Sequence, residues 1–158
     1  MIANILKVVL PAILACTFQP ISAWADNCGD RVSRLEAENK DLSLKQRMHV
    51  TSSFDAFYLE NRDPSAHITI SCGPAVSSFD VEWSGGSLSA YSALIDQVSQ
   101  SLDLSSDDFS SSLKQCWSQA AVSDDDEEGT IMISTSRAQI SCIDKDGRAQ
   151  ISVSRPSQ

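Results

Sequence analysis

Five cysteines are the residues of this chain whose type and spacing point most directly to chemistry. Cys16 lies in an N-terminal apolar run, which leaves an even set of four: Cys28, Cys72, Cys116 and Cys142. An even set in an exported chain predicts two disulfides. Three pairings of four cysteines are possible and the sequence does not choose among them, but the shorter loops favour Cys28 with Cys72 and Cys116 with Cys142. Close pairs typical of zinc sites or of Cys-x-x-Cys redox motifs are missing from the sequence, so we predict no metal and no other cofactor.

Acid–base chemistry has few candidate residues, because His49 and His67 are the only histidines. Either can be combined on paper with a serine and an aspartate, but the sequence has no G-x-S-x-G nucleophile elbow. His67 also falls on the outward face of a predicted strand. Asp80 and Glu82 share a strand face, as two glycosidase carboxylates would, but within a surface that we expect to be solvated. We therefore predict no catalytic residue.

Two acidic segments have the composition of a cation site. The run 124–128, Asp-Asp-Asp-Glu-Glu, is rich in the oxygen ligands that Ca²⁺ takes, but consecutive carboxylates in a loop point in several directions. The segment 144–147, Asp-Lys-Asp-Gly, resembles part of an EF-hand loop. With Gly147 at loop position 6, the first and twelfth positions are Cys142 and Val153, and neither is a carboxylate. We interpret this segment as a turn and predict no metal ligand.

Charged and aromatic residues indicate which classes of partner the protein can bind. A net charge of −9 excludes a generic electrostatic nucleic-acid binder, which needs a basic face. The segment between Pro64 and Ser136 is rich in acidic residues and contains a single Lys or Arg, Lys114. This composition is typical of a solubilising surface or of one that attracts a basic protein or peptide. Trp83 is in phase with buried strand residues and is assigned to the core, whereas Trp117 lies at the edge of a helix face and suits packing or a partner.

Residues 1–25 have the order of a secretory signal peptide. Lys7 precedes an apolar run over 8–18, and the small-residue site Ala-Trp-Ala follows at 23–25. This run is shorter than the roughly 20 residues that span a bilayer. We expect cleavage after Ala25 and export to the periplasm or the extracellular space. The alternative is the lipobox-like segment 13–16, which would place a lipid anchor on Cys16.

The N-terminal helical segment is expected over 26–48, since Arg31 to Met48 contains no Gly or Pro. A heptad assignment places Asn39 at an a position, as in coiled coils whose register is fixed by one polar residue. Only two heptads are present, so a terminal helix packed on its own domain is favoured over a coiled coil.

A small α+β domain is expected over 49–158. Alternation predicts strands over 67–72, 79–83 and 130–134, and a hairpin formed by 138–143 and 148–154. A two-residue turn pairs Ile140 with Val153, and a four-residue loop pairs Ile140 with Ile151. Apolar residues at helical spacing predict one helix from Ser87 to Leu102 and a second from Ser105. Phe109, Leu113, Cys116 and Ala120 share the inner face of the second helix. We leave 49–60 unassigned.

These elements predict an antiparallel sheet of about four to five strands with a two-helix layer on one face, plus an N-terminal helix. The favoured function is an exported, non-enzymatic binding or interaction protein with a protein or peptide partner. The alternatives are a small secreted hydrolase and a short coiled-coil structural protein of the cell envelope.

Overall fold

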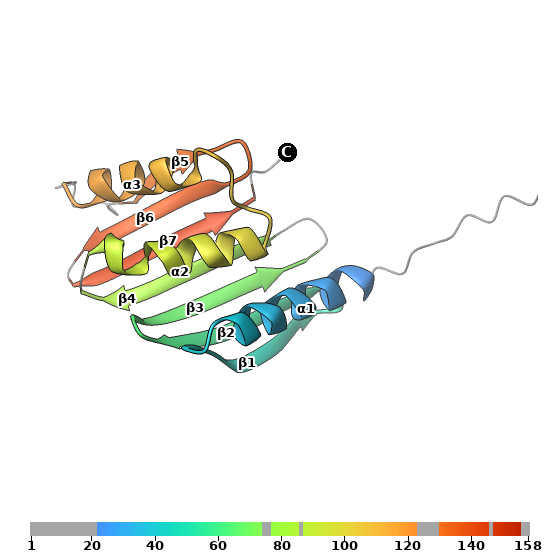
Figure 1. Ribbon diagram of the computed structural model, residues 1–158. Coiled ribbons are helices and arrows are strands. Elements are labelled where there is room, and N and C mark those ends of the chain that lie inside the picture. Colours follow the sequence, from blue (N-terminus) through green and yellow to red (C-terminus); the bar gives the residue numbers. More distant parts are fainter. Residues whose placement is uncertain (1–21, 74–76, 86, 123–129, 146, 156–158) are drawn as a thin grey trace, which may run out of the picture.

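The computed structural model describes residues 22–73, 77–85, 87–122, 130–145 and 147–155, with side chains from Asn27 onward. Within these residues, one sheet of seven antiparallel strands carries three helices on a single face (Figure 1). The strand order is β1-β2-β3-β4-β7-β6-β5. The elements are α1 (Ser22–Glu38), β1 (Leu42–Thr51), β2 (Phe54–Arg62), β3 (Ser65–Cys72), β4 (Ser77–Ser84), α2 (Leu88–Ser101), α3 (Phe109–Ala120), β5 (Ile131–Ser134), β6 (Gln139–Lys145) and β7 (Arg148–Ser154).

Apolar side chains alternate along the central strands, so one face of the sheet is buried. Phe57 of β2, Ile70 of β3 and Phe79 of β4 are cross-strand partners, and each is at most 2% exposed. Val153 of β7 and Ile140 of β6 continue the same row. The neighbouring row on the other face is mostly polar and consists of Gln46, Tyr58, Thr69, Asp80, Ser152, Ser141 and Met132. Because only one face is apolar, the helices cover that face and leave the other uncovered.

Each helix covers a different part of the apolar face. α1 contacts β1 and β2, α2 contacts β4, and α3 contacts β5 and β6. The predicted inner face of α3 is confirmed, since Phe109, Leu113, Cys116 and Ala120 are all buried. Two disulfides tie the outer helices to the sheet: Cys28 of α1 to Cys72 of β3, and Cys116 of α3 to Cys142 of β6.

The predicted sheet of four to five strands with a two-helix layer is wrong, because the sheet has seven strands and α1 lies beside α2 on the same face. The additional strands are β1 and β2, in residues that the sequence assigned to a helix or left unassigned. α1 ends at Glu38. The Asn39 side-chain oxygen accepts a hydrogen bond from the Asp41 N–H at 3.1 Å, which forms a turn.

The continuous helix over 31–48 that a coiled coil requires is therefore divided between α1 and β1. The absence of Gly and Pro permits a helix there but does not impose one. Leu42 and Leu44 instead alternate toward the core, and pairing with β2 decides the structure of the segment.

The C-terminal hairpin is confirmed, with the register of a two-residue turn. Ile140 pairs with Val153 and Cys142 with Ile151. Gly147 of this turn has φ of 76°, in the left-handed region. The second predicted helix begins at Phe109 rather than near Ser105, after a turn in which the Ser106 hydroxyl donates to the Asp108 carboxylate.

Gly147→Ala is predicted to lower the free energy of unfolding by about 1–2 kcal/mol, because a Cβ disfavours positive φ. Gly29→Ala in α1 is the matched control, since its Cβ would meet Arg47 at an ordinary 3.6 Å. This control should instead raise the free energy of unfolding by about 0.5–1 kcal/mol. Urea unfolding of both variants with the disulfides intact tests this, and equal effects would contradict the assigned turn.

Candidate functional site

A groove of about 490 Å³ lies between α2 and α3, on the helix-covered side of the sheet. This volume falls within the roughly 300–1,000 Å³ of most ligand pockets. Serine hydroxyls, a few apolar side chains and two opposite charges line it. The lining residues are Ser87, Leu88, Ser89, Ser92 and Asp96 on the α2 side, and Ser110, Leu113, Lys114, Trp117 and Ser118 on α3.

Three stacked aromatic rings fix the apolar end of the groove. Trp83 of β4 stacks on Tyr91 of α2, with ring centroids 4.4 Å apart, and on Trp117 of α3 at 5.1 Å. Trp83 is 4% exposed, so its assignment to the core is confirmed. Its indole N–H has no hydrogen-bond partner among the described residues, so stacking and burial hold this ring. Trp117 is only partly buried and contributes to the groove wall, and its neighbour in the stack limits its rotation.

The other end of the groove is acidic. The Asp96 carboxylate of α2 accepts hydrogen bonds from the exposed Ser110 hydroxyl of α3, at 3.3 Å to each oxygen. Asp107 and Asp108 directly precede α3 and line a neighbouring surface depression. Lys114, midway along α3, is the one cation that lines the groove. Within the described residues, no cationic group lies within 4.0 Å of the Asp96 carboxylate.

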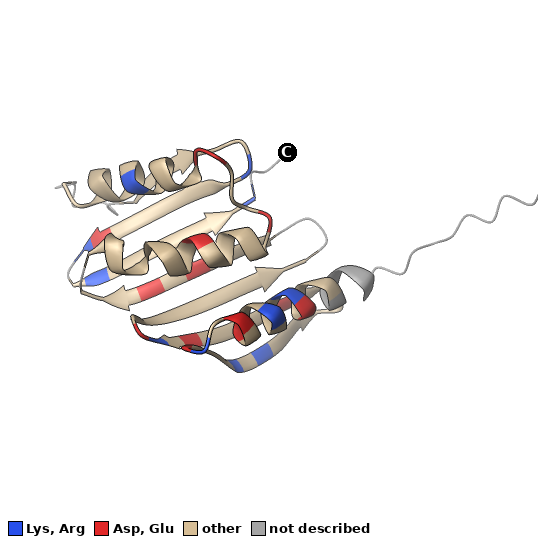
Figure 2. Ribbon diagram, viewed as in Figure 1, with Lys and Arg blue, Asp and Glu red and all other residues tan. Residues whose placement is uncertain are grey.

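The acids of the stretch 64–136 that the structure describes do not form one patch. Figure 2 shows acidic positions on β4, on α2 and on the loop before α3. Asp80 and Glu82 project from the uncovered face of the sheet, where Glu82 pairs with Arg148 at 2.9 Å. Asp103 is paired with Arg31 at 2.7 Å. Asp96, Asp107 and Asp108 are the described acids of this stretch that have no ion pair on the helix side, and they lie at or beside one end of the groove.

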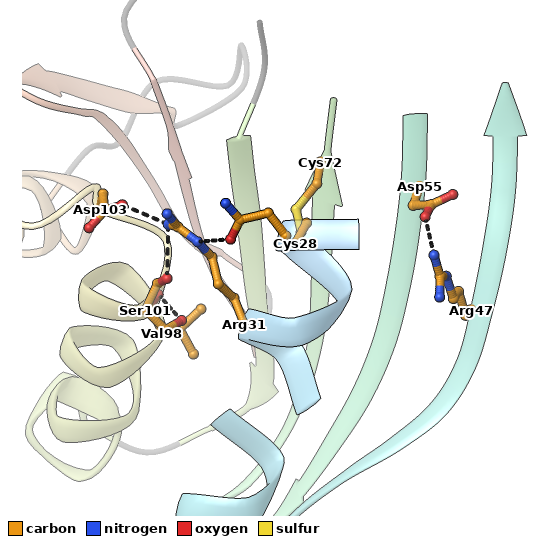
Figure 3. The surroundings of a disulfide bond; sticks show 9 residues. Cys28, Arg31, Arg47, Asp55, Cys72, Val98, Ser101 and Asp103 are labelled. Carbon is orange, nitrogen blue, oxygen red and sulfur yellow. Dashed lines mark hydrogen bonds and ion pairs between the residues drawn. A yellow bond between two sulfur atoms is a disulfide. The ribbon is translucent and has the colours of Figure 1, made fainter. Parts of the chain in front are cut away.

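Arg31 joins α1 to α2 next to the disulfide of Cys28 and Cys72 (Figure 3). Its guanidinium donates to the Ser101 carbonyl at 3.2 Å as well as pairing with Asp103. A small cavity of about 50 Å³ lies beside it and is partly lined by the disulfide. Since the Arg31 charge is already compensated, we interpret this region as a structural junction.

Asp55, cross-strand partner of Cys72, is the buried carboxylate of this end of the sheet (Figure 3). Its side chain is 2% exposed, and its two oxygens contact Arg47 at 2.7 Å and the His49 Nδ1 at 2.5 Å. Burial raises the pKa of Asp55, but hydrogen bonds and charge from Arg47 and His49 outweigh burial and lower the pKa below its usual value. The Arg47 guanidinium also lies over the Phe57 ring, 5.2 Å from its centroid.

The residues that the sequence considered for catalysis lie at two places. His67, Asp80 and Glu82 share the uncovered face, as expected, where His67 is the cross-strand partner of Glu82, and His49 lies beside Asp55. The His67 side chain is 76% exposed. His49 is the histidine with a buried acidic partner, yet neither His49 nor Asp55 lines the groove. The acidic run 124–128 lies outside the described residues.

Sequence reasoning did not find Asp55, Asp96 or the groove between α2 and α3. Asp55 is joined to Arg47 and His49 only through the β1–β2 hairpin, in residues that the sequence assigned to a helix up to 48 and left unassigned over 49–60. Leu42 and Leu44 alternate as in a strand, but the register shift between Leu44 and Gln46 interrupts this pattern before Arg47. Asp96 belongs to a correctly predicted helix, but nothing in the sequence places α3 beside it.

Among the described residues, no group of three or more His, Cys, Asp or Glu side chains is arranged to hold a metal ion. None of the described helices is long and apolar enough to cross a membrane. No family model, curated protein or solved structure matches this chain. The site is therefore interpreted from its own geometry.

Asp55→Asn is predicted to lower the free energy of unfolding at neutral pH by about 1.5–3 kcal/mol, because charged hydrogen bonds to Arg47 and His49 are lost. The pKa of Asp55 is lower folded than unfolded. Its contribution is thus complete above the unfolded value near pH 4 and disappears as pH falls through the folded pKa. The wild-type advantage should shrink in acid. Denaturant unfolding against pH measures this, with the exposed Asp30→Asn as control; a difference that is constant with pH would contradict the assignment.

Proposed function

We propose that this protein is an exported, non-enzymatic binding module whose groove between α2 and α3 receives part of a protein or peptide partner. The signal-peptide pattern of residues 1–25 and the two disulfides support export to the periplasm or extracellular space. Residues 1–21 lie outside the described residues. Cleavage after Ala25, rather than lipidation of Cys16, remains part of this proposal.

The observation that carries the binding proposal is the half-buried ring of Trp117 on the groove wall. Binding hot spots are enriched in tryptophan, and a ring held by stacking loses little conformational entropy when a partner packs on it. A catalytic site should instead combine a concave pocket with acid–base groups of shifted pKa. Here the carboxylate with a lowered pKa, Asp55, lies apart from the groove.

A small secreted hydrolase is the second candidate, favoured by one contact. His49 Nδ1 hydrogen-bonds the buried Asp55 carboxylate, an arrangement that orients histidine as a general base. Arg47 holds the other carboxylate oxygen, which also suits a purely structural ion-pair cluster. His49→Ala separates the candidates: it would abolish a hydrolytic activity that depends on this base and leave binding at the groove intact.

Export with two disulfides has a direct mass signature. We expect the natively exported protein to begin at Asp26 and to gain the mass of about four protons on reduction, two per bridge. Intact-mass measurement with thiol alkylation, before and after reduction, tests this. A chain that begins at Cys16 with added acyl mass would show a lipoprotein instead, and thiols that alkylate without reduction would contradict the two disulfides.

Groove binding is tested by photocrosslinking in the exporting cell. A photoreactive amino acid at Ser118, an exposed position of the groove rim, is expected to form an adduct with a polypeptide. The same amino acid at Thr69, on the uncovered face of the sheet, should not form that adduct. Trp117→Ala should abolish the Ser118 adduct.

Because Trp117 also packs on the core, Ser92→Gln serves as a second groove variant. It fills the groove without removing a stacked ring and should also reduce the adduct. Circular dichroism confirms that each variant is folded. An adduct that forms equally from Thr69, or that survives both groove substitutions, would overturn the proposed binding site.

A further inference from the structure

The two ends of the α2–α3 groove differ in chemistry. Trp117 and Tyr91 both stack on Trp83, so Trp117 lies near the end of α2 that carries Tyr91. Ser110, about two turns earlier on α3, instead donates a hydrogen bond to Asp96, toward the other end of α2. The two helices therefore run antiparallel, with an apolar end near Trp117 and an acidic end near Asp96 (Figure 1).

The separation of these ends sets the length of a ligand that spans both. Ser110 and Trp117 are seven residues apart on one helix, which at about 1.5 Å per residue corresponds to roughly 10 Å. An extended peptide advances about 3.3 Å per residue, so three residues cover this distance. A groove of about 490 Å³ accommodates a few side chains rather than a whole helix, whose diameter is about 10–12 Å.

Charge determines which group suits the acidic end. The Asp96 carboxylate is partly exposed and has only long hydrogen bonds from Ser110, at 3.3 Å. Asp107 and Asp108 add negative charge close to the same end of α3, where, among the described residues, Arg137 is the one base that lines their depression. Asp103 is instead paired with Arg31. A ligand cation at this end would gain a charge-assisted hydrogen bond. Lys114, between the two ends, opposes that cation and favours a ligand whose middle is uncharged.

We propose that the groove recognises an extended peptide segment with two specific side chains, an inference that rests on the proposed function. A large apolar side chain packs against Trp117, and a lysine or arginine three residues away pairs with Asp96. The segment between them is neutral and lies past Lys114. The same two side chains in the opposite chain direction satisfy the groove equally, since both contacts are made by side chains.

Nuclear magnetic resonance titration tests the proposal with defined hexapeptides, acetylated and amidated. The matching peptide is Gly-Phe-Gly-Gly-Lys-Gly, and its counterpart carries Glu in place of Lys. We expect the matching peptide to shift the indole N–H signal of Trp117 and to bind about threefold or more tightly than the Glu peptide, the size expected of one exposed charge pair.

Protein variants separate a local contact from the general attraction of an acidic protein. Asp96→Asn should weaken the matching peptide about threefold, and Lys114→Gln should strengthen it by a similar factor. Glu82→Gln is the matched control, because it changes net charge as Asp96→Asn does but lies on the uncovered face. Equal weakening by Asp96→Asn and Glu82→Gln would overturn the proposed pairing.

The outcomes also distinguish the two proposals. Equal binding of the Lys and Glu peptides, with Trp117 still shifted, would overturn the cationic requirement and leave the groove as a binding site. If neither peptide shifts Trp117 and the groove position forms no specific crosslink, the proposed function fails as well. If neither peptide shifts Trp117 but the crosslink forms, only the bipartite ligand is overturned.

Discussion

The one-sided burial of the sheet is the constraint on which the rest of this structure depends. Seven strands place their large apolar side chains on one face, and the other face carries mainly small or polar groups. Covering the apolar face removes it from water, at roughly 25 cal/mol for each Å² buried. All three helices must then lie side by side on that face. The groove between α2 and α3 exists because two helices that share one layer meet along their length.

The margins of the sheet are held by specific contacts rather than by a deep core. At one margin, β1 is an edge strand that is exposed from Lys45 to Thr51. Two register shifts and the basic residues of β1 oppose pairing with another chain. The buried Asp55 fixes this strand through Arg47 and His49. At the other margin, the disulfide of Cys116 and Cys142 ties α3 to the sheet beside the short strand β5. This disulfide therefore holds α3, which forms one wall of the groove, at the margin of the sheet.

Partner recognition, in our proposal, uses local charge rather than the net charge of the protein. The acids of the central sequence that the structure describes are divided between two faces, and two of them, Glu82 and Asp103, are already in ion pairs. What distinguishes the groove is the combination of a fixed aromatic ring and one unpaired carboxylate about 10 Å away along the helices, within the described residues. Separate apolar and charged contacts favour one spacing of ligand groups over others, which net charge alone does not achieve.

Local patterns in the sequence determined much of the domain. Alternation located β3, β4 and the β6–β7 hairpin, and helical spacing located α2 and the inner face of α3. These patterns sufficed because each of these elements buries one side, so the period of its apolar residues indicates both the type of element and its buried side. Loop length favoured the cysteine pairing that the structure has, and the phase of Trp83 assigned that ring to the core.

Only the tertiary structure decided the rest. Residues 42–51 are compatible with a helix, and they form a strand because β2 offers a partner edge. Asp55 meets Arg47 and His49, and Asp96 meets Ser110, because strand pairing and helix packing bring them together. Such contacts leave no local period in the sequence. They depend on how elements share one apolar face, and that arrangement minimises exposed apolar area over the whole domain at once.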